Sequence, residues 1–462
     1  MICRTPDTRT PPAAVGQSGL AAEDPSHVAA KMDAAGATYD LAFWLAYLSN
    51  LALMTAHSLL FRYADFVLHL GGTKFLLGWI VGLGMLGCLA MRLAQGVAID
   101  RYGPRLMWVA STALFAISCF GHLAITQVDG PAIFLLRIAY NCAIAGFFGA
   151  SITFISARAP VSRMAEVVGM LGTSGFLAMV LGAWLGDLLL GQTPIELRQL
   201  QWMFSLAGSL GVASMALGYL ATSSEIHVPA RRHISPFALL KRYHPGAVLL
   251  VGAATGFGLA LPGTFFRPYA ESIGISKIAV FFAIYAPTAF AARFLTRRLP
   301  ERLGNRNVML LGLASMSVGM LLLTTAKNNW LFAPPAIFLA IAHALLFPSV
   351  VAAASEAFPL RNRGLATTLI LAMLDIGTLV GSPIAGAILT YAGLVGLPSF
   401  PTMFTAAAIA IATSGVIYAL APRPSKYDRN SRRLRWNGAP SSAELPTPAS
   451  LEIAHARPQA SR

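Results

Sequence analysis

Charged side chains are scarce in this chain. Only 11% of its 462 residues are Asp, Glu, Lys or Arg, whereas 56% are hydrophobic. A soluble globular domain carries about 25% charged residues and is apolar over less than about half of its length. The composition therefore argues against a soluble multidomain enzyme and predicts a chain that lies largely in lipid.

Cysteine is also scarce, and its placement excludes two classes of site. The four cysteines are Cys3, Cys88, Cys119 and Cys142, and the last three lie in long apolar stretches. This placement predicts buried thiols rather than a disulfide framework or a zinc site, so we expect no metal and no other cofactor. The sequence also lacks the phosphate-binding loop Gly-x-x-x-x-Gly-Lys-Ser/Thr, which argues against direct ATP coupling, and it lacks the common hydrolase motifs.

Long apolar stretches are what the chain has in abundance. A helix needs about 20 apolar residues to cross a hydrocarbon layer of ~30 Å. Twelve stretches meet this need, at 41–61, 75–99, 106–125, 131–155, 166–189, 201–221, 246–266, 278–296, 308–325, 330–354, 365–391 and 399–420. Strands of a membrane barrel would be about ten residues long and would alternate in polarity. We therefore expect an all-α polytopic membrane protein with twelve transmembrane helices.

The basic residues predict the orientation of these helices. Fourteen Lys and Arg lie in the loops of one side and six in the loops of the other. Since basic loops stay in the cytoplasm, we expect both termini there and a multi-pass protein of the cell (inner) membrane. The net charge of +15 then reflects topology and contact with membrane lipid, not nucleic acid.

The two halves of the chain repeat one another. Short motifs recur at offsets of 201 to 206 residues. The recurring pairs are Arg62 with Arg267, Asp65 with Glu271, Arg92 with Arg293, Asp100 with Glu301, and 131–135 with 335–339. Each repeat holds six spans, an even number, so both halves enter the membrane in the same orientation and predict two parallel six-helix bundles.

The repeat and the polar segments divide the chain into five parts. We expect a disordered cytoplasmic leader at 1–38, the first bundle at 39–221, a cytoplasmic connector at 222–245, the second bundle at 246–421 and a basic disordered cytoplasmic tail at 422–462. The leader lacks the basic start and short apolar core of a signal peptide, and Met32 is an alternative start.

A charged loop with a fixed spacing lies between the second and third spans. It consists of Gly96, Asp100, Arg101, Gly103 and Arg105, and a degenerate copy between the eighth and ninth spans consists of Glu301, Arg302, Gly304 and Arg306. This loop resembles the signature of the major facilitator superfamily of secondary transporters. The resemblance implies the major facilitator fold and a gate motif that latches the cytoplasmic side. The alternative is that these charges only set topology.

Ionisable residues within the spans are costly, so each is a candidate site. Asp375 lies near the middle of the eleventh span and is expected to carry a proton or to pair with a cationic substrate, unless it makes a structural salt bridge. Arg137, with Tyr140 and Asn141 one turn away, is expected to bind an anionic or hydroxylated ligand or to pair structurally. His343 and Asn50 are further candidates for lining the substrate cavity.

The duplicated charges have two open interpretations each. Arg62 with Asp65 and Arg267 with Glu271 predict either an outer-side gate or an interfacial anchor. For Arg92 and Arg293, in equivalent places of spans two and eight, we expect a role in structure or gating rather than in substrate contact.

The expected function is that of a carrier, not an enzyme. The resemblance favours a monomeric, proton-coupled secondary transporter of a small organic solute, with efflux slightly ahead of uptake. An uptake symporter for organic anions or sugars is the alternative. Export is not established, because the glycine pattern that the family's antiporters carry in span five is only half present: Gly172, Gly175, Gly182 and Gly186 occur, but Asp187 stands where Gly-Pro would begin. Two alternatives from other functional classes remain open. One is a transporter fold that serves as a sensor or scaffold, and the other is a polytopic membrane enzyme.

Overall fold

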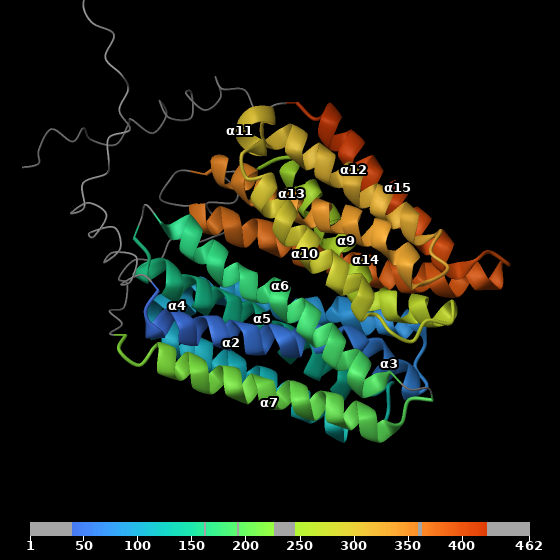
Figure 1. Ribbon diagram of the computed structural model, residues 1–462, viewed down its shortest axis with the longest axis horizontal. Helices are drawn as coiled ribbons and strands as arrows, with labels where there is room; N and C mark the ends of the chain where they lie inside the picture. Colours follow the sequence, from blue (N-terminus) through green and yellow to red (C-terminus); the bar gives the residue numbers. More distant parts are fainter. Residues whose placement is uncertain (1–38, 161–162, 192–193, 226–244, 359–362, 423–462) are drawn as a thin grey trace, which may run out of the picture.

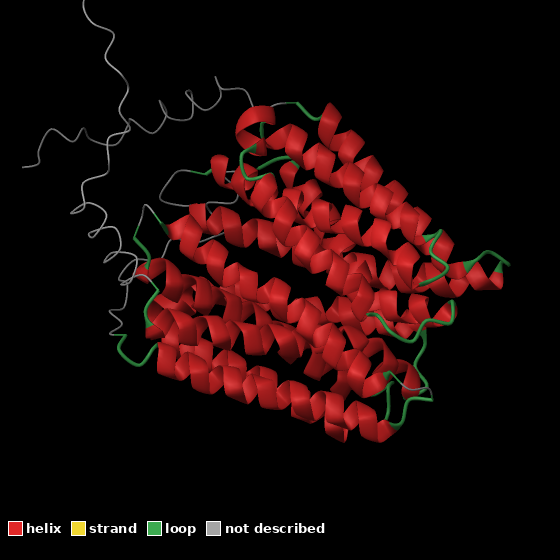
Figure 2. Cartoon of the chain, in the orientation of Figure 1, coloured by secondary structure: helices red, strands yellow, loops and turns green. Residues whose placement is uncertain are grey.

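The structure is a computed structural model that describes residues 39–160, 163–191, 194–225, 245–358 and 363–422. The expected leader, the tail beyond residue 422 and most of the connector lie outside these residues. Within the described part every regular element is a helix, and no strand occurs (Figure 2). The all-α prediction is confirmed.

The first half of the chain forms one run of helices. They are α2 (Leu41–Leu59), η1 (Leu60–Arg62), α3 (Tyr63–His69), α4 (Lys74–Gly121), η2 (His122–Ala124), α5 (Pro131–Arg158), α6 (Met164–Leu190) and α7 (Leu197–Ala221). The second half forms α9 (Val248–Ser272), α10 (Ala279–Leu295), α11 (Leu299–Leu303), α12 (Asn305–Leu323), η3 (Asn329–Phe332), α13 (Ala333–Glu356), α14 (Arg363–Leu394) and α15 (Ser399–Leu420). Most of the predicted span limits agree with these bounds to within a few residues.

The helix α4 contains two spans rather than one. Its 48 residues would extend for about 72 Å at 1.5 Å per residue, more than twice the hydrocarbon thickness. The helix breaks at Gly103, whose φ of 82° and ψ of 161° are not helical and whose φ favours glycine. Gly304, its counterpart in the repeat, has a φ of 79° and separates α11 from α12. The backbone therefore repeats the same break at both copies of the charged motif.

The count of spans depends on how two helices are treated. Ten helices of the described residues are long and apolar enough to cross a membrane, and α10 is a shorter apolar helix. Twelve is reached when the two arms of α4 are counted separately and α10 is included. Many large apolar side chains point away from the protein, such as Leu188 at 66% and Leu295 at 78% exposed, as expected for helices that face lipid.

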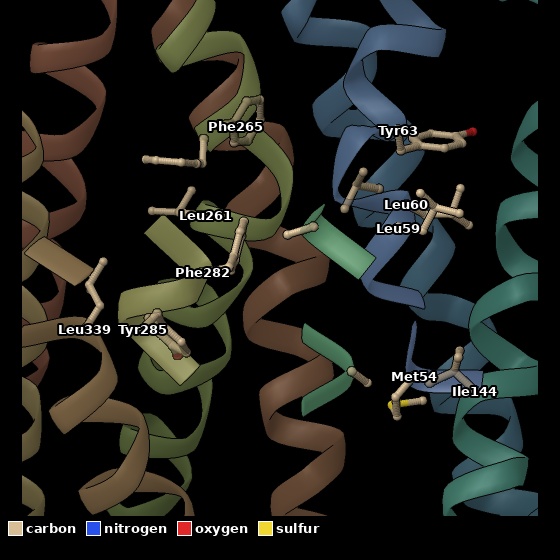
Figure 3. Packing of buried hydrophobic residues seen from close by; sticks show 14 of the residues in the cluster. Met54, Leu59, Leu60, Tyr63, Ile144, Leu261, Phe265, Phe282, Tyr285 and Leu339 are labelled. Carbon is tan, nitrogen blue, oxygen red and sulfur yellow. The ribbon is translucent and has the colours of Figure 1, made fainter. Parts of the chain in front are cut away.

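The helices pack as two groups that lie side by side (Figure 1). One group consists of α2, α4, α5, α6 and α7, and the other of α9, α10, α12, α13, α14 and α15. Figure 3 shows the apolar packing on both sides of the seam, with Met54 and Ile144 in the first half and Leu261, Phe265 and Leu339 in the second. Two helix pairs make most of the contact between the groups, α4 with α14 and α6 with α10, and α3 makes a smaller contact with α9.

Small residues bring the backbones of α4 and α14 close together. A Cβ added to Gly78 would lie 2.5 Å from the carbonyl oxygen of Ser382, and one added to Gly82 would lie 2.7 Å from that of Leu379. Close backbone approach of this kind is how helices associate in lipid, where no hydrophobic force drives them together. The seam between the two groups is therefore tight near the first turns of α4.

Candidate functional site

Four charged residues meet at one end of the seam. We call this the outer end, following the orientation expected from the basic loops, and the end that carries Gly103 and Gly304 the inner end. Arg62 and Arg267 are 0% and 1% exposed, and Asp65 and Asp187 are also buried. Arg62 donates from Nε to Asp65 Oδ2 at 2.6 Å, and Arg267 Nε lies 2.9 Å from Asp65 Oδ1. Asp65 thus links an arginine of each half.

Asp187 makes the second link between the halves. Arg62 Nη1 donates to its Oδ1 at 3.1 Å. The backbone amides of Ile278 and Ala279, where α10 begins, donate to the same carboxylate at 3.1 and 2.6 Å. An acidic side chain is favourable there because the first amides of a helix have no partner within the helix. A residue of α6 therefore holds the start of α10.

The sequence prediction of this cluster was incomplete. Arg62, Asp65 and Arg267 lie together, but Glu271 is 51% exposed in its side chain and 3.8 Å from Arg267 Nη2. Asp187 lies in the cluster instead, although the sequence singled it out only as a break in a glycine pattern. The signal that would have found it is its charge within a span, the same criterion that selected Asp375. Two arginines and two aspartates balance in this network, which we call the outer network.

A second ion pair joins the halves further along the seam. Arg92 Nε lies 2.5 Å from Asp375 Oδ2, and the two side chains are 13% and 12% exposed. Arg92 is on α4, 18 residues or about 27 Å beyond Lys74 at its outer end, and Asp375 is on α14. In the sequence these two residues are separate candidates, 283 positions apart. The structure gives Asp375 a salt bridge to a neighbouring helix, and we call this contact the inner pair.

Arg137 is a buried cation in the first half. It is 9% exposed, its guanidinium carbon lies 4.4 Å from the ring centroid of Tyr63 and 4.7 Å from that of Tyr140, and its Nε has no hydrogen-bond partner. Within the described residues no carboxylate pairs with it. Its predicted neighbours serve other contacts, because Tyr140 shares a 2.6 Å hydrogen bond with His57, and the Asn141 amide donates to the Arg137 carbonyl of its own helix at 3.1 Å.

The two remaining candidates for lining the cavity, Asn50 and His343, make hydrogen bonds to neighbouring helices. Asn50 is 3% exposed and its Nδ2 donates to Ser174 Oγ at 2.5 Å, so it joins α2 to α6. His343 Nδ1 shares a 2.8 Å hydrogen bond with the Tyr285 hydroxyl, so it joins α13 to α10. The His343 ring also packs against Phe176 of the first half, at 6.1 Å between centroids. His343 therefore lies at the seam, near Arg293, whose guanidinium carbon lies 5.8 Å from the Phe176 ring centroid.

The two copies of the charged motif lie at the inner end. Arg105 stacks on Tyr219 at 4.3 Å, and Arg101 lies 5.2 Å from the ring of Tyr102. Arg306 donates to the carbonyl groups of Tyr418, Ala419 and Ala421 at 3.1, 2.6 and 3.0 Å, which caps the end of α15. The other motif residues are the partly buried Asp100, the exposed Glu301 and Arg302, and Gly96, at which an added Cβ would meet nothing.

Among the residues that the structure describes, no group of three or more His, Cys, Asp and Glu side chains could hold a metal ion. The buried ion pairs of the described residues lie instead along the seam, whereas the more exposed pairs Arg158 with Asp40 and Arg163 with Glu166 lie within the first half. The outer network and the inner pair each tie one half to the other, and the aromatic contacts between the halves include Phe61 with Phe282 and Phe176 with His343. Such an arrangement can hold two bodies together at either end and release them there.

Comparisons with known proteins agree with one another. A sequence model described as "Major Facilitator Superfamily" matches residues 41–300 and 248–457. The "Uncharacterized MFS-type transporter MJ1560" of Methanocaldococcus jannaschii is 23% identical over 352 residues, which cover 73% of this chain and 88% of that protein. The "Uncharacterized MFS-type transporter YhhS" of Escherichia coli K12 is 24% identical over 365 residues, which cover 78% of this chain and 86% of that protein.

Solved structures share the fold. The nucleoside transporter NupG superposes with a TM-score of 0.67 at 15% identity, over 83% of this chain and 100% of that chain. A D-xylose-proton symporter superposes with a TM-score of 0.68 at 15% identity, over 83% of this chain and 98% of that chain. At these identities the likeness concerns the arrangement of the helices.

Proposed function

Because the chain belongs to the Major Facilitator Superfamily, we propose that it is a secondary active transporter that carries a small organic solute across the cytoplasmic membrane by alternating access, with a proton as coupling ion. The observation that carries the proposal is the pair of ionic links between the halves, the outer network and the inner pair. The two links lie at different depths along the seam. A carrier that rocks two bundles about a central site needs such contacts, because each must form in one state and break in another.

The outer network has the properties of a gate. Opening the outer end would separate Asp65 from Arg267 and Asp187 from the first amides of α10. Breaking one partner away from a buried pair is costly, by about 3–5 kcal/mol, unless water or a new partner replaces it. The network therefore stabilises the closed outer end, and an opened end would let water reach all four side chains.

The inner pair has the properties of a proton-sensitive link. A proton on the Asp375 carboxylate would remove the charge that Arg92 contacts at 2.5 Å. Arg92 would then lie in the membrane without a counter-charge, and its long side chain would move toward the inner surface. Protonation thus loosens α4 from α14, which couples proton uptake to movement of the halves.

Export is the first direction that we propose, and uptake by symport is the second. One observation favours symport. Asp187 stands where the family's antiporters have Gly-Pro in span five, and its carboxylate accepts hydrogen bonds from the first amides of α10. The D-xylose-proton symporter among the structural neighbours has the same fold. The proposal also includes both termini in the cytoplasm, a monomeric chain that contacts membrane lipid, and no enzymatic activity.

The test is proton-coupled flux in vesicles. The full chain is reconstituted into liposomes that contain a pH-sensitive dye, and D-xylose, benzoate, alanine and tetraphenylphosphonium are added with and without a pH gradient. The response of protein-free liposomes is subtracted, because benzoic acid and tetraphenylphosphonium cross lipid without a carrier. We expect at least one solute to move protons, and Asp375→Asn to abolish accumulation while it leaves exchange of the solute intact. Asp40→Asn is the matched control, because it removes a carboxylate from the exposed pair with Arg158. Unchanged accumulation by Asp375→Asn, or no solute-dependent proton movement, would contradict the proposal.

A further inference from the structure

The two main helix pairs that bridge the halves are counterparts in the internal repeat, but among the residues that the structure describes only one of these two pairs has a complete ion pair. Arg92 on α4 and Arg293 on α10 occupy equivalent positions at an offset of 201 residues. In the first bridging pair, Arg92 contacts Asp375 on α14. In the second bridging pair, Arg293 contacts α6, and no carboxylate among the described residues pairs with it.

The sequence of α6 explains the difference. The repeat offsets place the counterpart of Asp375 between 169 and 174, and the residues there are Gly, Met, Leu, Gly, Thr and Ser. Gly172 is the one that faces Arg293, because a Cβ added to it would lie 3.9 Å from Arg293 Nη1. The second bridging pair thus has an arginine equivalent to Arg92 but no acidic residue equivalent to Asp375. Gly172 stands beside the arginine in its place.

The surroundings of Arg293 form a seam-facing group that we call the Arg293 cluster, made of Arg293, Phe176, Tyr285 and His343. The guanidinium carbon lies 5.8 Å from the Phe176 ring centroid, and the Tyr285 hydroxyl shares a 2.8 Å hydrogen bond with His343 Nδ1. Arg293 is only partly buried, and it lies where the two halves meet. The guanidinium is therefore not fully enclosed at the junction of the halves, and the Phe176 ring lies beside it.

Unpaired charges in a membrane protein are rare and costly, and they mark places where a ligand or ion supplies the partner. The other seam arginines are matched, since Arg62 and Arg267 contact aspartates of the outer network and Arg92 contacts Asp375. Arg137, which also lacks a carboxylate, is held between two tyrosine rings inside the first half. Arg293 is therefore the seam arginine whose counter-charge is missing from the described chain.

We infer that Arg293 binds the negative charge of the transported solute, and that this solute is a small organic carboxylate. The inference rests on the proposed function and adds the class of substrate. In the bound state the solute carboxylate completes at α6 and α10 the ion pair that Asp375 completes at α4 and α14. A guanidinium binds a carboxylate through two parallel hydrogen bonds, and the Phe176 ring offers an apolar face for the rest of the solute. Neutral amides and amines gain no such pair, so they are excluded.

Thermal unfolding of the purified full chain in detergent tests the inference with matched ligands. The probes are acetate, succinate and benzoate, each compared with its amide, together with benzylamine. We expect at least one carboxylate to raise the unfolding temperature and its amide to leave it unchanged. A shift from amides or benzylamine without one from the carboxylates would overturn the inference, and so would the absence of a carboxylate shift.

The glycine opposite Arg293 offers a matched pair of variants. Gly172→Asp supplies the missing carboxylate from within the chain, so it should weaken carboxylate binding by about tenfold or more, the equivalent of one lost charged contact. Gly172→Asn has nearly the same shape without the charge and should bind as the natural chain does. Equal binding by the two variants would overturn the inference. If Gly172→Asp does not fold, Arg293→Gln and Arg293→Lys give the same comparison, since only the lysine keeps the charge.

Vesicle flux separates the failure of this inference from that of the proposed function. If a sugar or a cation moves with protons and no carboxylate does, the carrier function stands and the substrate class is wrong. If carboxylates bind and depend on Arg293 but do not cross the membrane, the binding site stands and the carrier function is wrong.

Discussion

Removing the charge of Asp187 should open the outer end of the protein. In Asp187→Asn the contact to Arg62 Nη1 loses its charge, and one of the two amides at the start of α10 loses a carboxylate acceptor. Arg62 keeps its 2.6 Å contact to Asp65, so the cost falls at the lower end of the range for a broken buried pair, about 3 kcal/mol. The same variant weakens the link from α6 to α10, which only the closed outer end makes.

A cost of this size changes the population of the two states strongly. About 3 kcal/mol corresponds to roughly a hundredfold shift in the equilibrium toward the open outer end. The assay is labelling of Phe61→Cys, in a background without the natural cysteines, by a maleimide that cannot cross the membrane. Phe61 is only partly exposed and stacks on Phe282 of the other half at 4.6 Å between centroids, so its labelling should become faster when the halves separate there.

Glu271→Gln is the control for the same assay. It also removes one negative charge beside an arginine of the network, but its side chain is 51% exposed and lies 3.8 Å from Arg267. Exposed pairs contribute at most about 1 kcal/mol, so labelling should change little. If Asp187→Asn labels no faster than the natural chain, or if Glu271→Gln matches it, the buried network does not hold the outer end closed.

Three further predictions concern stability, each measured by thermal unfolding in detergent. Arg306→Gln removes three hydrogen bonds to the last carbonyl groups of α15 and should lower the stability by about 1–2 kcal/mol; no change would mean that water replaces this cap. Gly256→Ala puts a Cβ 1.9 Å from the Leu374 carbonyl oxygen and should cost about 1–3 kcal/mol, whereas Gly96→Ala, with nothing nearby, should be neutral or stabilising. Gly103→Ala forces a φ of 82° with a ψ of 161°, a region that essentially only glycine adopts, on an alanine and should cost about 1–3 kcal/mol; an unchanged melting temperature would mean that the break does not need a glycine.

Local properties of the sequence were sufficient for most of the fold. A stretch of apolar residues in lipid must be helical, because every backbone amide and carbonyl needs a partner within its own segment. For this reason α5, α6, α7 and α15 begin and end near their predicted limits. The repeat likewise paired the two copies of the charged motif, and the structure adds that both copies share a backbone break, at Gly103 and Gly304.

The partners of the embedded charges could not be read in the same way. Arg92 and Asp375 are 283 residues apart in sequence and 2.5 Å apart in space, and no spacing rule connects them. Asp187 had no visible partner in the sequence because its partners are backbone amides of another helix and Arg62, 125 residues away in the sequence. Glu271 matched the repeat and yet faces outward, because the repeat fixes the position of a residue and not the direction of its side chain.

The sequence by itself determined that this chain is a bundle of membrane helices with an internal repeat. It also identified most of the charged residues that are embedded in the membrane. Both are local properties, set by the cost of placing polar groups in hydrocarbon. Only the tertiary structure decided which charges meet across the seam, that Asp187 holds α10, and that Arg293 lacks the acid that Arg92 has. The physical reason is that an ion pair between helices depends on how two bundles pack and which way each side chain points, and neither is contained in the order of residues along one helix.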